Sequence, residues 1–203
     1  MPSFHDFRFL STDGKHNVFA RECTPDGEVR AVLQIAHGVA EHIYRYAPFM
    51  EFLAENGFVV VANDHLGHGK TAENEQELCF FAEKDGWNDV VSDMDTLHKL
   101  TAAKYPGVPY FLFGHSMGSF LTRTYIIDHP EGLKGVVISG TGQNPGAVIA
   151  AGKLMAKLEM IDNGPMYHSP TLDKLAFGSY NKKYDHVRTK LDWLTREEAV
   201  VAA

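Results

Sequence analysis

Residues 110–128 read YFLFGHSMGSFLTRTYIID. The first four residues form a short apolar run that predicts a buried strand, and the segment from Ser119 to Asp128 is predicted to be helical. Between them lies GHSMG, residues 114–118, which matches the pattern G-x-S-x-G in the strand-to-helix context that this pattern requires. A serine on such a sharp turn has a strained backbone and holds its hydroxyl above the edge of the sheet. The stretch therefore predicts that Ser116 is a nucleophile.

The residues around Ser116 support that prediction. Side chains at the flanking positions would collide with neighbouring segments, so Gly114 and Gly118 provide the room that the turn needs. The helix that begins after Ser116 has free N–H groups in its first turn, and they point toward any oxyanion that forms there. Met117 is the candidate donor in this turn, and His115 completes the motif.

A second loop, HGVAEH at residues 37–42, directly follows an apolar run that ends at Ala36. A loop that contains Gly38 can turn a backbone N–H toward the same site, and acyl transfer needs two such donors. We expect these donors on Val39 and Met117. His37 and His42 could take part in catalysis directly. The alternative is loop packing and surface exposure, in which case His37 only shapes the turn.

The rest of the first 140 residues alternates between strand and helix patterns. Apolar runs at residues 31–36, 58–62 and 135–138 are separated by predicted helices at 46–55 and 87–105. This alternation predicts parallel strands with crossover helices on both faces of a mostly parallel sheet, an α/β fold. Two opening strands, at 3–11 and 18–22, are predicted to pair antiparallel through a tight turn at Asp13-Gly14.

The pattern of apolar residues changes after residue 140. Apolar residues recur at helical spacing and no further β-rich run follows; they are Val148, Ala151, Leu154, Leu158 and Ile161. We therefore predict a core at residues 1–140 and a mainly helical region at residues 141–203.

Composition excludes several classes of protein. Nineteen Lys and Arg against 26 Asp and Glu give a formal net charge of −7, and the basic residues are scattered, so we expect no nucleic-acid partner. Cys23 and Cys79 have no paired spacing, and the first ten residues lack the build of a signal peptide. We expect a reducing, cytoplasmic location and no transmembrane segment, because the apolar runs are too short to span a bilayer.

Two further patterns suggest other chemistry. Residues 67–71, GHGKT, end like a phosphate-binding loop, but the first glycine of that motif would fall on Asp64, whose carboxylate would repel phosphate. His65 and His68 are three residues apart, yet Gly67 disfavours a helix there and no further ligand pattern completes a metal site. We expect neither a cofactor nor a metal.

The runs HGVAEHIYRYAPFMEFLAENGFVVVANDHLGHGKT, residues 37–71, and GHSMGS, residues 114–119, resemble the α/β-hydrolase fold. Within that fold they are similar to the monoacylglycerol lipase and lysophospholipase-like serine hydrolases. The resemblance implies Ser116 as nucleophile, Val39 and Met117 as oxyanion donors, and residues 64–69 as a structural turn near the pocket. It also implies a small apolar ester as substrate and residues 141–203 as the start of a helical cap, a candidate for contact with a lipid surface.

The sequence departs from this family after the cap begins. Family members place an Asp or Glu and then a His on loops after later sheet strands, and those strands are absent here. Six residues available by type lie at 141–203, and we assign none of them to a triad; they are Asp162, Asp173, Asp185, Asp192, His168 and His186. We expect a catalytically incomplete fragment of a serine ester hydrolase. The alternative is a non-catalytic protein of the same fold that binds a ligand or partner. The oligomeric state and the preferred acyl chain and alcohol stay open.

Overall fold

Six strands form one sheet in the order β1-β2-β4-β3-β5-β6. The computed structural model describes residues 1–189, 191–195 and 197. Its strands are β1 (Ser3–Leu10), β2 (Asn17–Thr24), β3 (Ala31–Ala36), β4 (Phe58–Asn63), β5 (Tyr110–His115) and β6 (Leu133–Ser139). Strand β2 is antiparallel to both β1 and β4, whereas β4, β3, β5 and β6 are parallel to one another. The mostly parallel α/β sheet expected from the sequence is confirmed.

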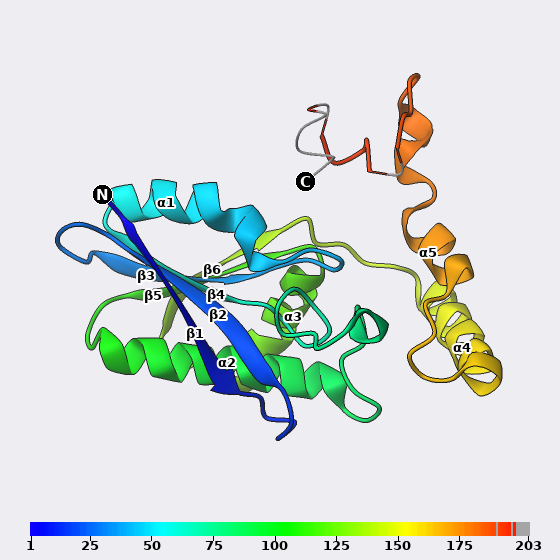
Figure 1. Cartoon of the computed structure of the whole chain (residues 1–203), viewed down its shortest axis with the longest axis horizontal. Coiled ribbons are helices and arrows are strands. Elements are labelled where there is room, and N and C mark those ends of the chain that lie inside the picture. Colours follow the sequence, from blue (N-terminus) through cyan, green and yellow to red (C-terminus); the bar gives the residue numbers. More distant parts are fainter. Residues whose placement is uncertain (190, 196, 198–203) are drawn as a thin grey trace. The chain divides into compact units, whose positions relative to one another are not determined.

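Helices cover both faces of this sheet (Figure 1). Helix α1 (Ala47–Glu55) follows a short 3-10 turn, η1 (Ile43–Tyr46), and lies on one face. Helices α2 (Gly86–Lys104) and α3 (Met117–Asp128) lie on the opposite face. All belong to a compact unit, Met1–Gln143, and a second unit comprises Asn144–Ala203. We describe the two units separately.

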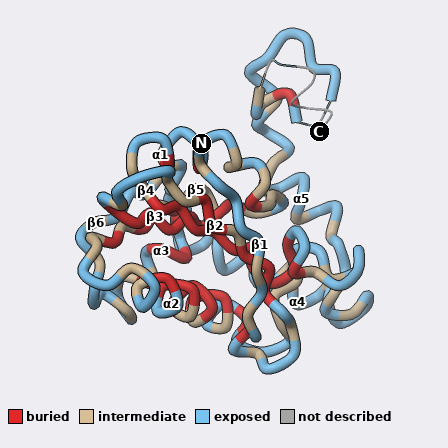
Figure 2. The backbone as a smooth tube through the Cα atoms, turned by 60° about the vertical axis from the view of Figure 1, so that its left-hand side comes forward, coloured by how far each residue is buried: buried red, intermediate tan, exposed pale blue. Residues whose placement is uncertain are grey.

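The alternation of side chains along β3 explains why both faces need helices. Leu33 and Ile35 are buried in the same cluster as Met50 of α1. Val32 instead shares a cluster with Leu97 of α2. Successive side chains of a strand point to opposite faces, so a strand that is buried along its whole length must be covered on both sides. Figure 2 shows the buried residues concentrated in the central strands.

The outer strand β6 is much less buried than its neighbours (Figure 2). Within the described residues it pairs only with β5, and Val137 is 52% exposed. An open edge presents unpaired N–H and C=O groups to any strand of suitable length. The end of β6 nevertheless contributes to the site below, through Ser139.

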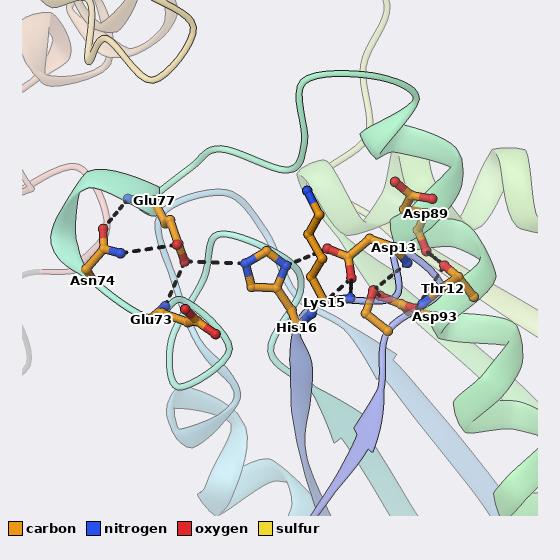
Figure 3. Close-up of polar contacts among 10 residues, drawn as sticks. Thr12, Asp13, Lys15, His16, Glu73, Asn74, Glu77, Asp89 and Asp93 are labelled. Carbon is orange, nitrogen blue, oxygen red and sulfur yellow. Dashed lines mark hydrogen bonds and ion pairs between the residues drawn. The ribbon is translucent and has the colours of Figure 1, made fainter.

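The loop between β1 and β2 differs from the expected tight turn. Gly14 does have a positive φ of 72°, but the loop spans residues 11–16 rather than two residues. Polar contacts explain its length (Figure 3). Thr12 donates its N–H to Asp93 of α2 at 2.8 Å, and the His16 ring lies between Asp13 at 2.5 Å and Glu77 at 3.6 Å. The longer loop thus ties the hairpin to α2 and to the 3-10 turn η2 (Glu75–Glu77).

The second unit is helical, with α4 (Gly146–Asn163), α5 (Pro170–Phe177) and the 3-10 turn η3 (Tyr180–Lys183). No side chain of α4 is buried, and Ile161 is 78% exposed. Trp193 packs edge-on against Tyr180, with ring centroids 4.7 Å apart. Among the described residues, no helix is both long and apolar enough to cross a membrane.

Candidate active site

Ser116 stands between the end of β5 and the start of α3. Its φ of 51° and ψ of −117° lie in a region that residues with a Cβ rarely adopt. The surrounding backbone holds this conformation, because the Ser116 N–H donates to the Ser139 carbonyl of β6 at 3.0 Å and its carbonyl accepts from the Ser119 N–H at 2.9 Å. In the described part of the chain the Ser116 hydroxyl has no hydrogen-bond partner, and it does not cap α3. A strained serine with a free hydroxyl is the arrangement that a nucleophile elbow needs.

The two glycines of the motif allow α3 to approach the sheet closely. A Cβ on Gly118 would lie 2.0 Å from the Ala36 carbonyl oxygen, at the end of β3. A Cβ on Gly114 would lie 2.3 Å from the hydroxyl of Thr122. Both separations are far below van der Waals contact, so α3 can lie this close to β3 and β5 only with glycine at these two positions.

We expect Gly118→Ala to destabilise the protein by about 3 kcal/mol or more, because the clash is with backbone atoms that cannot move aside. The matched control is Gly152→Ala in α4, where an added Cβ meets nothing within 4 Å. This control should be neutral or stabilise by about 0.5–1 kcal/mol through helix propensity. Urea unfolding of both variants checks the pair. Equal stabilities would show that α3 does not depend on the close approach to β3.

The loop after β3 lies directly beside Ser116. A Cβ on Gly38 would lie 3.1 Å from the Ser116 Cβ. The Gly38 N–H donates to the carboxylate of Glu41, which also accepts from the Tyr46 hydroxyl at 2.9 Å. Val39 and Met117 each present a backbone N–H with no acceptor among the described residues. The sequence-predicted residues from the two loops are therefore brought together, and both candidate donors are unoccupied.

The loop at residues 64–71 supports this arrangement from behind. Asp64 is fully buried, and its carboxylate accepts from the N–H of Ile43 at 2.8 Å and of Lys70 at 2.7 Å. Burial raises the pKa of Asp64, and these two N–H donors oppose that rise. Gly69 has a φ of 48°, and a Cβ there would lie 2.1 Å from the Asp64 carboxylate. Asp64 thus holds the turn together and fills the space beside the Lys70 N–H, which argues against phosphate binding.

The histidines near the site have defined places. His37 is fully buried, and burial lowers its pKa to about 3. His42 is only half-buried, in the loop before η1. His115 places its Nδ1 3.3 Å from the Ser139 hydroxyl. Within the described residues, no group of three or more His, Cys, Asp or Glu side chains is placed to hold a metal ion.

The Asp and His residues of the second unit that could by type belong to a triad make local contacts or are exposed. Asp192 accepts from the Thr189 hydroxyl at 2.6 Å and from the Arg188 N–H at 2.5 Å. His168 and His186 are exposed. Among the described residues no histidine is hydrogen-bonded to the Ser116 hydroxyl, so the base is not assigned.

Sequence reasoning gave no role to Glu41 or Ser139. Glu41 follows Gly38 by three residues, and that proximity was the available signal for its bond to the Gly38 N–H. Ser139 faces His115 in the register of β5 and β6, which alignment of the two strand ends could have shown.

A family model described as "Serine aminopeptidase, S33" (Hydrolase_4) matches residues 27–203 of the chain. The chain belongs to this family. Membership confirms the resemblance drawn from the two motif runs, and it places the chain in the α/β-hydrolase fold. A carboxyl esterase from Bacillus coagulans, solved with glycerol, superimposes with a TM-score of 0.86 at 32% identity over 98% of this chain and 64% of that one.

Curated relatives of this family member include monoglyceride lipases. A "Monoglyceride lipase homolog" of Monkeypox virus is 28% identical over 91% of this chain and 64% of its own length. A "Monoacylglycerol lipase" of Mycolicibacterium smegmatis is 32% identical over 66% of this chain and 48% of its own length. The chain therefore spans less than two thirds of the length of these relatives.

Proposed function

We propose that the protein carrying this sequence hydrolyses small, largely apolar carboxylic esters, such as monoacylglycerols or lysophospholipids, with Ser116 as the nucleophile. The observation that carries the proposal is the Ser116 hydroxyl, which has no partner among the described residues and sits on a strained turn beside Gly38. In this reaction the Ser116 oxygen attacks the ester carbonyl, and the negative charge develops on the carbonyl oxygen. The reaction needs no cofactor or metal.

The N–H groups of Val39 and Met117 are the proposed oxyanion donors. Neither N–H has an acceptor among the described residues. Donors held ready for a developing charge stabilise the transition state more than the substrate, which is the property that accelerates the reaction. Proton removal from Ser116 requires a histidine base, which we do not assign.

The choice of ester over peptide rests on the relatives. The family model is described by an aminopeptidase, whereas the similar proteins are called monoglyceride lipases or a carboxyl esterase. The proposal also takes residues 1–140 as the hydrolase core and residues 141–203 as part of a cap. Contact of that region with a lipid surface and a cytoplasmic location stay predictions.

We expect the highest kcat/KM on a monoacylglycerol or another apolar ester, compared with a peptide anilide and a phosphate monoester at equal concentration. The proposed backbone N–H donors suit a single carbonyl oxygen and not a phosphate group with several charged oxygens, and the preference over a peptide rests on the relatives. Turnover by the protein carrying this sequence is the measurement. A preference for the peptide or the phosphate ester would contradict the ester assignment.

A further inference from the structure

Three buried imidazole rings lie together behind the loop that holds Gly38. The rings of His37 and His65 are 4.2 Å apart between centroids, and those of His37 and His68 are 5.2 Å apart. None of the three is more than 2% exposed. The Nε2 atoms of His65 and His68 have no hydrogen-bond partner among the described residues. In His37, by contrast, both ring nitrogens form hydrogen bonds.

The hydrogen bonds of His37 determine its tautomer. The backbone N–H of His65 points at His37 Nε2, with 3.0 Å between the two nitrogens. A backbone N–H can only donate, so Nε2 must be the unprotonated acceptor and the ring proton must lie on Nδ1. Nδ1 is 2.7 Å from the carbonyl oxygen of Gly38 and therefore donates to it. The loop at residues 64–71 thus fixes the proton on the side of the ring that faces Gly38.

The Gly38 carbonyl and the Val39 N–H belong to one peptide group. That group is planar and trans, so its C=O and N–H bonds point in opposite directions, and fixing the first fixes the second. In the described part of the chain, the bond from His37 is the single hydrogen bond to this peptide, since the Val39 N–H has no acceptor. The preceding peptide is held separately, through the bond from the Gly38 N–H to Glu41.

We propose that His37 is a positioning residue for ester hydrolysis: its Nδ1–H holds the Gly38 carbonyl and thereby aims the Val39 N–H at the oxyanion that forms beside Ser116. This inference rests on the proposed function, which takes Val39 as an oxyanion donor. His37 touches neither the substrate nor the reacting atoms. Its effect passes through one peptide plane.

Two uncharged variants separate this role from packing. In His37→Asn, the side-chain amide nitrogen reaches the place of Nδ1 and can still donate to the Gly38 carbonyl. In His37→Gln, the amide reaches the place of Nε2 and that donor is lost. Both remove the ring, so they disturb the histidine cluster to a similar extent. We expect His37→Gln to lower kcat by about 10²-fold with little change in KM, the cost of one oxyanion donor, and His37→Asn to keep most of kcat.

Equal kcat losses in the two variants, or a loss confined to KM, would overturn the proposal. A second measurement needs no variant: long-range ¹H–¹⁵N correlation spectra report which ring nitrogen of His37 carries the proton. A proton on Nδ1 is expected, and a proton on Nε2 would overturn the proposal even if the variants do not fold. Failure of the proposed function would give a different result, because hydrolysis would then persist in Ser116→Ala.

Discussion

Ser116→Ala is expected to lower kcat for ester hydrolysis by about 10⁵-fold or more in the protein carrying this sequence. Removal of a serine nucleophile abolishes the covalent intermediate and leaves only the contribution of binding and oxyanion donors, roughly 10³–10⁴ over the uncatalysed reaction. The substitution removes one oxygen that has no hydrogen-bond partner among the described residues, so stability should change little. Turnover of a short-chain nitrophenyl ester and of a monoacylglycerol, with a thermal melt of each protein, checks both expectations.

The matched control is Ser119→Ala in the same helix. Its hydroxyl donates to the Ser116 carbonyl at 2.6 Å, and that carbonyl also accepts the Ser119 N–H, so one bond remains after the change. We expect a much smaller loss of kcat in this variant. Equal losses in the two variants would mean that the backbone of the turn, and not the Ser116 hydroxyl, limits the reaction. A parent protein without Ser116-dependent turnover would favour the alternative of a non-catalytic binding protein.

Acidification from pH 7.5 to pH 5 is expected to lower the free energy of unfolding by about 2 kcal/mol through His37, and His65 adds a loss in the same direction. Burial lowers the pKa of His37 to about 3 and the pKa of His65 well below its usual value. His37 stays neutral in the folded protein over this range, whereas in the unfolded chain it binds a proton below about pH 6.5. Proton uptake by the unfolded state favours unfolding, and each histidine with a lowered pKa contributes in this direction by linkage.

Other groups also contribute to this dependence, and Asp64 opposes it, because its raised pKa favours the folded state in acid. The pKa of His68 is also lowered by burial, which adds to the loss of stability in acid. Burial opposes a rise in the pKa of His16, but its contacts with Asp13 and Glu77 prevail and raise it. A raised pKa acts in the other direction: the stabilisation from His16 is complete below about pH 6.5 and is lost as pH rises through the folded-state pKa. The contribution of His16 to stability is smaller than that of His37, because the ion pair of His16 with Asp13 is partly exposed to solvent.

Urea unfolding at pH 7.5 and pH 5 measures the predicted change. His65→Gln should reduce the difference in stability between the two pH values, since one linked proton is removed. The control is His5→Gln, which removes an exposed histidine of β1 and should leave the difference unchanged. Stability that does not fall between pH 7.5 and pH 5 would contradict the neutral, buried state of the cluster.

Local patterns were enough to predict several parts of the molecule. The strand, sharp turn and helix around Ser116 follow from neighbouring residues, because an apolar run, two glycines and helical spacing act within one short segment. The parallel order of β3, β4, β5 and β6 follows from the alternation of strands and helices. The antiparallel pairing of β1 with β2 was also correct. The contacts that hold their loop were not predicted, since His16 and Thr12 contact Glu77 and Asp93, far along the chain.

The sequence by itself determined which residues have the chemistry for the site: a serine on a glycine-flanked turn and a glycine-bearing loop after a buried strand. Only the tertiary structure decided what each one does. The sequence predicted that Gly118 needs room, and the structure shows which segment lies there: β3 passes beside α3, with the Ala36 carbonyl oxygen facing this glycine. His37 looked like a residue that merely shapes a turn, and the N–H of His65 fixes where its proton lies. Such contacts join segments distant in sequence, and no local pattern encodes them.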